Sequence, residues 1–298
     1  MNQKNRFIIA IILNSLIVVI EIISGLISGS VSLITDAFHN FGDVLALIIS
    51  LIALLYREKK ATLKMTYGYI RSEMMGGFVH SFFLILSMLF IFTESIQRII
   101  KPSTVNSIYM IVIASIAFLI NAISAFLIKD KPHLHKDKEA HEDLNIKASF
   151  VHLLGDALFS LGVVSGGILM LIFNIQYIDP ILSIIFSIII IAESIDILKK
   201  TFLSLMDAAP EQLNKITNQI LSHSEIKSIH DIHIIKPSSK DIHFSAHIVL
   251  KKALSLEKIE NLLEVLRCEL ASFGITHILF QPETEKYHNS EYLCQSHN

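Results

Sequence analysis

Apolar residues fill six long stretches in the first two-thirds of the chain, and each stretch is about as long as a membrane-spanning helix. A helix needs about 20 apolar residues to cross the hydrocarbon core of a bilayer. The first stretch is too long for the apolar part of a secretory signal peptide, and no small-residue cleavage site follows it. The pattern therefore predicts six membrane-spanning helices, over residues 7–27, 31–55, 74–97, 107–128, 147–173 and 178–198.

The pattern changes near Met206, after which no stretch is long enough to span a bilayer. "QLNKITNQILSHS" has the periodicity of an amphipathic helix, and "SIHDIHIIK" and "DIHFSAHIVL" alternate like strands. A second helix, "SLEKIENLLEVLRCELASF", and a third strand, "ITHILFQ", follow. The order αββαβ predicts an α+β domain with its helices on one face of a small sheet. We therefore expect a six-helix transmembrane domain over residues 1–205 and a separate domain over residues 206–298.

Composition and charge agree with a multi-pass membrane protein. Of the 298 residues, 52% are hydrophobic and only 17% are charged, whereas about a quarter are charged in a soluble domain. A net charge of -2 without a long basic run argues against nucleic acid as a partner. Lysine and arginine gather after the second, fourth and sixth apolar stretches. The positive-inside rule then predicts that both chain termini lie in the cytoplasm.

Two of the predicted spans carry the same motif, H-x-x-G-D, in the pentapeptides HNFGD and HLLGD. Residues four apart lie on one face of a helix, so each span offers one imidazole and one carboxylate together. Ionisable groups inside a membrane are costly and mark ion pathways. Two neutral imidazoles and two carboxylates balance a divalent cation and suit tetrahedral Zn²⁺. The alternative is a helix-stabilising hydrogen bond within each pair. The candidate ligands are His39, Asp43, His152 and Asp156.

Several segments resemble the cation diffusion facilitators, a family of zinc-type metal/proton antiporters, and the resemblance covers essentially the whole chain. They are "GSVSLITDAFHNFGDVLAL", "TYGYIRSEMMGG", "LNIKASFVHLLGDALFSLGVV" and "HDIHIIK…HFSAHIVL". The resemblance implies a homodimer, six spanning helices and a cytoplasmic, ferredoxin-like metallochaperone domain. It also implies a transport site on the second and fifth helices, made by the same four His and Asp residues. In the family, two histidines with two aspartates are associated with a preference for zinc over cadmium.

Asp36 lies one helical turn before His39 on the same face. It is either a metal ligand or a hydrogen-bond acceptor and proton group that orients His39. We favour the second role because four ligands are already present. Glu21, in the first span, is expected to be a buried hydrogen-bond partner or an interface-facing group rather than a ligand.

Each predicted strand of the second domain places a histidine on the face away from the helices. The family resemblance implies a regulatory zinc site there. An alternative is a polar sheet face that pairs with a second protomer. His230 could replace His233 in the site. The expected ligands are His233, His247, His277 and Glu283.

Two further segments contain possible metal ligands. The connection after the fourth span is either a charged linker or a weak zinc-capture loop, through His133, His135 and His141. The tail residues Cys294 and His297 form either an extra metal clamp or a frayed end.

These features predict a secondary transporter rather than an enzyme, located in the plasma membrane. It would move Zn²⁺ out of the cytoplasm by alternating access, with H⁺ as the counter-ion. Metal binds only deprotonated imidazole and carboxylate, so protons and zinc compete for the same side chains. A cobalt- or iron-preferring transporter is an alternative. A membrane metalloenzyme is less favoured because the sequence has no H-E-x-x-H motif. A membrane-bound metal sensor would not need the site within the spans.

Overall fold

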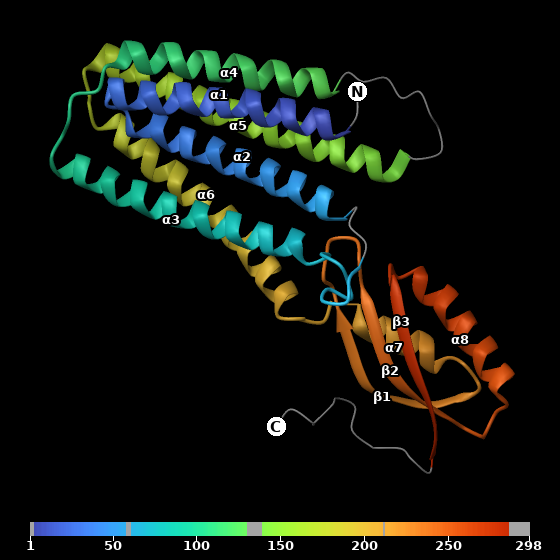
Figure 1. The fold of residues 1–298 in the computed structure, drawn as a ribbon. Coiled ribbons are helices and arrows are strands. Elements are labelled where there is room, and N and C mark those ends of the chain that lie inside the picture. The colour runs from blue at the N-terminus through green and yellow to red at the C-terminus, as the bar shows by residue number, and fades with distance from the viewer. Residues whose placement is uncertain (1–2, 58–60, 130–138, 211, 286–298) are drawn as a thin grey trace. The chain divides into compact units, whose positions relative to one another are not determined.

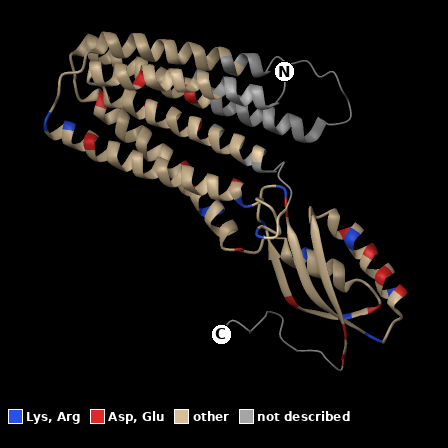
Figure 2. Ribbon diagram, viewed as in Figure 1, with Lys and Arg blue, Asp and Glu red and all other residues tan. Residues whose placement is uncertain are grey.

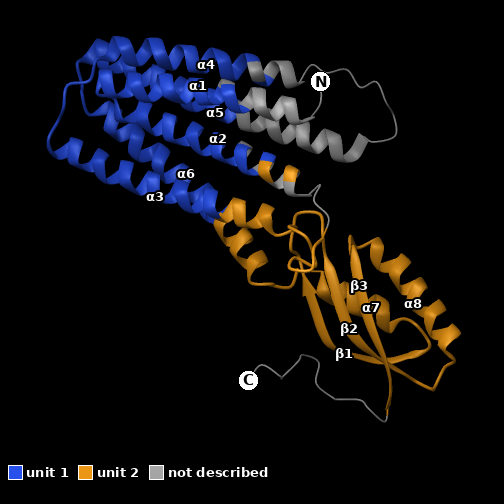
Figure 3. Cartoon of the chain, in the orientation of Figure 1, with its two compact units in different colours: residues 1–51, 79–197 blue, residues 52–78, 198–298 orange. Residues whose placement is uncertain are grey.

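The chain folds into two compact units in a computed structural model, which describes residues 3–57, 61–129, 139–210 and 212–285. Residues 1–51 and 79–197 form the first unit (Figure 3). Residues 52–78 and 198–298 form the second unit. The second unit therefore includes the beginning of one long helix and the ends of two others, together with the small sheet.

The described residues contain six long helices, in the order that the apolar pattern predicts (Figure 1). Three apolar stretches are long enough to cross a membrane by length and composition: Ser72–Ile100, Leu154–Phe173 and Ile178–Leu205. Two shorter apolar stretches are Asn14–Ser28 and Ser107–Ile123. The helices are α1 (Gln3–Ser28), α2 (Val31–Arg57), α3 (Ser72–Ile100), α4 (Ser107–Lys129), α5 (Glu139–Phe173) and α6 (Ile178–Leu205).

The helices of the first unit are nearly free of charge and expose large apolar side chains. Figure 2 shows long stretches without Lys, Arg, Asp or Glu along them. Leu26 and Phe90 are each 69% exposed, as expected for side chains that face lipid rather than water. The interior is also apolar, with Leu33, Met110 and Val163 fully buried in one cluster from α2, α4 and α5.

A glycine allows close packing at the H-x-x-G-D motif of α2. A Cβ atom on Gly42 would lie 2.5 Å from Cδ2 of Leu84 on α3. A larger residue at this position would require the Leu84 side chain to shift. The matching Gly155 on α5 has no such neighbour within 4 Å.

The beginning of α2 is fixed by a carboxylate from α6. Asp179 is fully buried and accepts hydrogen bonds from Ser30 Oγ (2.6 Å) and from the backbone N–H groups of Val31 (2.7 Å) and Ser32 (3.1 Å). A carboxylate at a helix N-terminus satisfies free N–H groups and favours the helix dipole. This cap holds the helix that carries three of the candidate site residues.

The second unit contains the predicted αββαβ order. Its elements are α7 (Leu213–Leu221), β1 (Ile226–Ile235), β2 (His243–Leu250), α8 (Leu256–Ala271) and β3 (His277–Thr284). Among the described residues the sheet has the order β1-β2-β3, with β1 antiparallel and β3 parallel to β2. Ile220 of α7 and Leu266 of α8 pack against Phe244 in the core of this unit. Both helices therefore cover one face, and the other face carries the histidines.

Candidate metal centres

Residues of α2 and α5 meet in a buried group inside the helical bundle. Potential ligand atoms of His39, Asp43 and Asp156 all lie within 4.8 Å of one another. The Nε2 atom of His39 is 3.4 Å from Oδ1 of Asp156. His39 is only 9% exposed and Asp156 only 5%. The structure thus brings together three of the four expected ligands.

The fourth expected ligand, His152, belongs to α5 and precedes Asp156 by four residues. Its side chain lies outside the described residues. The helical spacing places its Cα on the same face as that of Asp156, one turn earlier.

A second contact joins the same two helices one turn away. Ser160 of α5 donates a hydrogen bond from Oγ to Oδ2 of Asp36 at 3.1 Å. Asp36 is 3% exposed, and its other oxygen has no hydrogen-bond partner among the residues described. Asp36 is not part of the three-residue group. Its hydrogen bond with Ser160 can hold in place the face of α2 that carries His39.

A third contact joins α2 to α1. Asn40 donates from Nδ2 to Oε2 of Glu21 at 2.8 Å, and Glu21 is only 1% exposed. Glu21 therefore has the hydrogen-bonding role expected of it. Ser160 and Asn40 were not singled out from the sequence, because Ser160 lies outside the repeated motif and Asn40 occupies one of its variable positions.

The buried group can hold a divalent cation. Uncompensated carboxylates are strongly disfavoured in an apolar interior. An ion between Asp43 and Asp156 would balance both charges, while His39 would add a nitrogen ligand. This donor set of imidazole and carboxylate suits Zn²⁺ and neighbouring transition metals.

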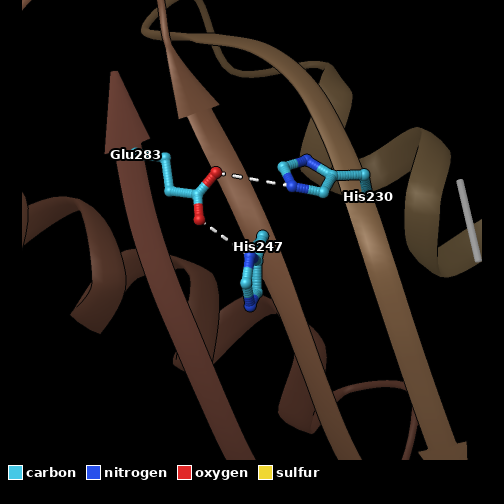
Figure 4. Close-up of side chains that lie close together, drawn as sticks. All are labelled: His230, His247 and Glu283. Carbon is cyan, nitrogen blue, oxygen red and sulfur yellow. Dashed lines mark ion pairs between the residues drawn. The ribbon is translucent and has the colours of Figure 1, made fainter. Parts of the chain in front are cut away.

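The open face of the sheet carries a second group, made of His230, His247 and Glu283 (Figure 4). Nδ1 of His247 is 2.8 Å from Oε1 of Glu283, and Nε2 of His230 is 3.4 Å from Oε2. Each strand contributes one residue. The group can bind one metal ion through two nitrogen atoms and a carboxylate.

A β-bulge decides which histidine of β1 joins this group. His230 pairs with His247, whereas His233 pairs with Ser245, so β1 has one extra residue between the two pairs. Asp231 lies in this bulge with a φ of 49°. His230 thereby lies directly opposite His247. His233 lies further along, with Nε2 3.2 Å from Oδ1 of Asp231.

His277 lies away from the three-residue group of the sheet. Its Cα partner on β2 is His243, whereas Glu283 pairs with Val249. The rings of His277 and His243 are 5.2 Å apart. Burial, together with the charge of His277, lowers the pKa of His243. The structure therefore does not bring His233 or His277 to Glu283. Asp231 is an additional acid beside the group, with Oδ2 3.3 Å from Nε2 of His247.

The remaining expected ligands cannot be placed. The loop residues His133 and His135, and the tail residues Cys294 and His297, lie outside the described residues. His141 is in α5, but its side chain also lies outside the described residues.

An apolar helical bundle with a buried His/Asp group, joined to a small α+β unit with surface histidines, defines an integral membrane protein that handles metal cations. Residues 7–206 match the profile of the cation efflux transmembrane domain. Residues 208–285 match that of the cytoplasmic domain of cation efflux proteins. The chain belongs to this family, the cation diffusion facilitators, which confirms the resemblance found in the sequence.

Bacterial relatives align along much of the chain. It is 32% identical to the cadmium, cobalt and zinc/H(+)-K(+) antiporter of Bacillus subtilis (strain 168), over 98% of this chain and 93% of the relative. It is 34% identical to the zinc transporter ZitB of Pectobacterium atrosepticum, over 80% of this chain and 73% of the relative. It is 27% identical to the metal cation efflux system protein CzcD of Cupriavidus metallidurans, over 92% and 85%.

Proposed function

We propose that this protein exports divalent metal cations, with zinc as the preferred ion, from the cytoplasm in exchange for protons. The observation that carries the proposal is the meeting of His39, Asp43 and Asp156 between α2 and α5 within the apolar bundle. A secondary transporter needs such a site, reached in turn from either side of the membrane.

The proposed ligands of the transported ion are His39, Asp43, His152 and Asp156. The side-chain contacts of His39, Asp43 and Asp156 support this set. The helical position of His152 is compatible with it. Asp36 is proposed to orient the site through Ser160 instead of binding the ion. The names of two relatives include zinc, and that of the Bacillus subtilis relative also includes cadmium and cobalt.

Proton coupling follows from the chemistry of the ligands. The ordinary pKa of histidine is near 6.5, so an imidazole changes charge between an acidic exterior and a neutral cytoplasm. Protonation of His39 would leave the imidazolium paired with Asp156, whose Oδ1 is 3.4 Å from its Nε2. Zinc must displace that proton to bind. The name of the Bacillus subtilis relative includes both H(+) and K(+), and its H(+) supports protons as a counter-ion.

The proposed arrangement in the membrane has six spans, with the transport domain over residues 1–205 and both termini in the cytoplasm. The basic residues after the second, fourth and sixth spans support this orientation. Residues 206–298 then form a cytoplasmic domain, and two copies of the chain form a homodimer in the plasma membrane. The match to the cytoplasmic domain of the family supports this assignment.

The cytoplasmic domain is proposed to bind regulatory zinc through His247 and Glu283. His230 fills the position for which His233 was the first choice, because it lies 3.4 Å from Glu283 through its Nε2 atom. Zinc bound there would couple the cytoplasmic metal concentration to transport.

Metal-by-metal flux through the purified protein in lipid vesicles tests the proposal. Zinc is expected to cross fastest, with slower flux of cobalt and cadmium, and vesicles without protein give the background. Absence of protein-dependent flux for every metal would refute transport. A cobalt flux above that of zinc would instead support the cobalt-preferring alternative.

A further inference from the structure

Glu21 is a buried acid inside an apolar helix, and the proposed transport site does not include it. It is the only charged residue between Arg6 and Asp36 in the sequence. Glu21 is 1% exposed and belongs to α1 of the first unit. Its Oε2 atom accepts the hydrogen bond from Asn40, whereas Oε1 has no hydrogen-bond partner among the described residues. Oε1 of this carboxyl group is therefore available to hold a proton.

The charged groups that act on Glu21 come from two neighbouring helices. The carboxylates of Asp36 on α2 and Asp156 on α5 both repel a negative charge on Glu21, and Asp36 does so more strongly. His39 of α2 acts in the opposite sense and more weakly. The helix α4, which also packs against α1, has no charged residue before Lys129. A negative charge on Glu21 is therefore unfavourable in this acidic and apolar environment while no cation is bound.

Asn40 links Glu21 to the proposed transport site. It directly follows His39 in the chain, and its Nδ2 atom lies 2.8 Å from Oε2 of Glu21. A divalent cation held by the group that includes His39 and Asp156 would add two positive charges to this part of the bundle. Positive charge nearby favours the ionised form of a carboxyl group. Metal binding would therefore expel a proton from Glu21, and metal release would allow the proton to return.

We propose that Glu21 carries a proton that the transported cation displaces by its charge, without direct coordination. When the cation binds, the O–H bond of the carboxyl group breaks, its electron pair stays on the carboxylate, and H⁺ leaves to water. When the cation leaves, the carboxylate takes up H⁺ again. The inference rests on the proposed exchange of metal for protons. It adds one group to the ligands that exchange protons themselves.

The substitution Glu21→Gln separates the proton from the hydrogen bond. Glutamine keeps the length of the side chain and an oxygen that can accept from Asn40, but it has no carboxyl proton to release. Zinc binding to the full-length protein is measured by titration calorimetry near neutral pH, in buffers of different ionisation enthalpy. The comparison of buffers gives the number of protons released for each zinc ion bound. Protons released at the sheet site are the same in both proteins and cancel in the difference.

We expect Glu21→Gln to release about one proton fewer per zinc ion than the wild type. The apparent zinc affinity of the variant should then rise about tenfold less per pH unit. A purely structural role for Glu21 predicts a different result, because the affinity would change by the same factor at every pH. The number of protons released would then stay the same.

Glu193→Gln is the matched control, because it makes the same chemical change at an exposed residue of α6. This variant should release as many protons per zinc ion as the wild type. The substitution Asp36→Asn tests the other buried acid that has an oxygen without a hydrogen-bond partner among the described residues.

Two results would overturn the role of Glu21. The first is equal proton release by the wild type and Glu21→Gln, and a loss in Asp36→Asn would then give the proton to Asp36. The second is a loss in Glu193→Gln as large as that in Glu21→Gln. Zinc binding that releases no protons in the wild type would contradict metal–proton exchange itself. The failure of the proposed function is thus distinguishable from the failure of this inference.

Discussion

The two candidate metal centres use the same kinds of side chain in different settings. In the helical bundle, His39 and Asp156 are buried between α2 and α5 and Asp43 is partly buried, and we call this group the enclosed site. On the sheet, the side chain of His230 is 5% exposed, whereas those of His247 and Glu283 are 27% and 12% exposed. The enclosed site needs a cation or protons to balance its charges, whereas water and dissolved ions reach the sheet site. This difference supports the proposal that the first site transports metal and the second senses it.

The largest expected effect comes from removing a carboxylate of the enclosed site. Asp156→Asn leaves the shape nearly unchanged but removes the charge that faces His39. Zinc flux in vesicles should fall more than about 100-fold, since even outer partners of metal ligands are worth 10–100-fold. Asp196→Asn, which changes an exposed carboxylate of α6, should retain flux. Equal losses in both variants would contradict the assignment.

A smaller effect is expected at the hydrogen bond that braces Asp36. Ser160→Ala removes the donor to Oδ2, and the zinc affinity of the enclosed site should fall about tenfold. Flux measured against zinc concentration gives the change in apparent affinity. Ser165→Ala is the matched control, because the hydroxyl of Ser165 donates to the carbonyl of Leu161 in its own helix. An unchanged affinity in Ser160→Ala would show that Asp36 is oriented by other contacts.

The sheet site should affect metal content more than transport. His247→Ala is expected to lower the zinc bound per chain by one ion, measured by metal analysis after dialysis. Flux at saturating zinc should change by less than about threefold, because the enclosed site stays intact. His277→Ala should leave metal content unchanged, since His277 lies beside His243 and not beside Glu283. Loss of zinc in His277→Ala would restore the ligand set expected from the sequence.

The smallest expected effect concerns the other pair of histidines on the sheet. Burial and the charge of His277 lower the pKa of His243 from its usual 6.5. At His243 the folded state then binds fewer protons than the unfolded state. The contribution of His243 to the stability of the folded state is therefore full above pH 6.5 and is lost as the pH falls through the lowered pKa. Unfolding followed by circular dichroism should show slightly lower stability at about pH 5.5 than at about pH 7.5, and His243→Gln should reduce that difference. An identical pH dependence in the variant would remove His243 as its cause.

The sequence predicted the enclosed site better than the sheet site, and the reason is geometrical. A helix has a constant period, so the spacing of His39 and Asp43 gave their common face without knowledge of the packing. The prediction that Asp156 joins this site required the additional assumption that α5 faces α2, and the repeated motif suggested that assumption. The number of spans and the role of His152 stay predictions.

Strand alternation was a weaker guide because a single inserted residue changes the register. The bulge at Asp231 aligns His230 with His247, and only the pairing of β1 with β2 reveals it. The parallel pairing of β3 likewise puts His277 beside His243. The roles of Ser160, Asn40 and Asp179 could not be predicted, since each depends on a contact between helices that are distant in sequence.

The central claim is that zinc and protons exchange at the site between α2 and α5. Zinc flux in vesicles under an imposed pH gradient tests it most directly. We predict that an acidic compartment on the side that receives zinc accelerates transport, and that zinc movement carries protons the opposite way. Zinc flux that is the same with and without the gradient, and that moves no protons, would contradict the account.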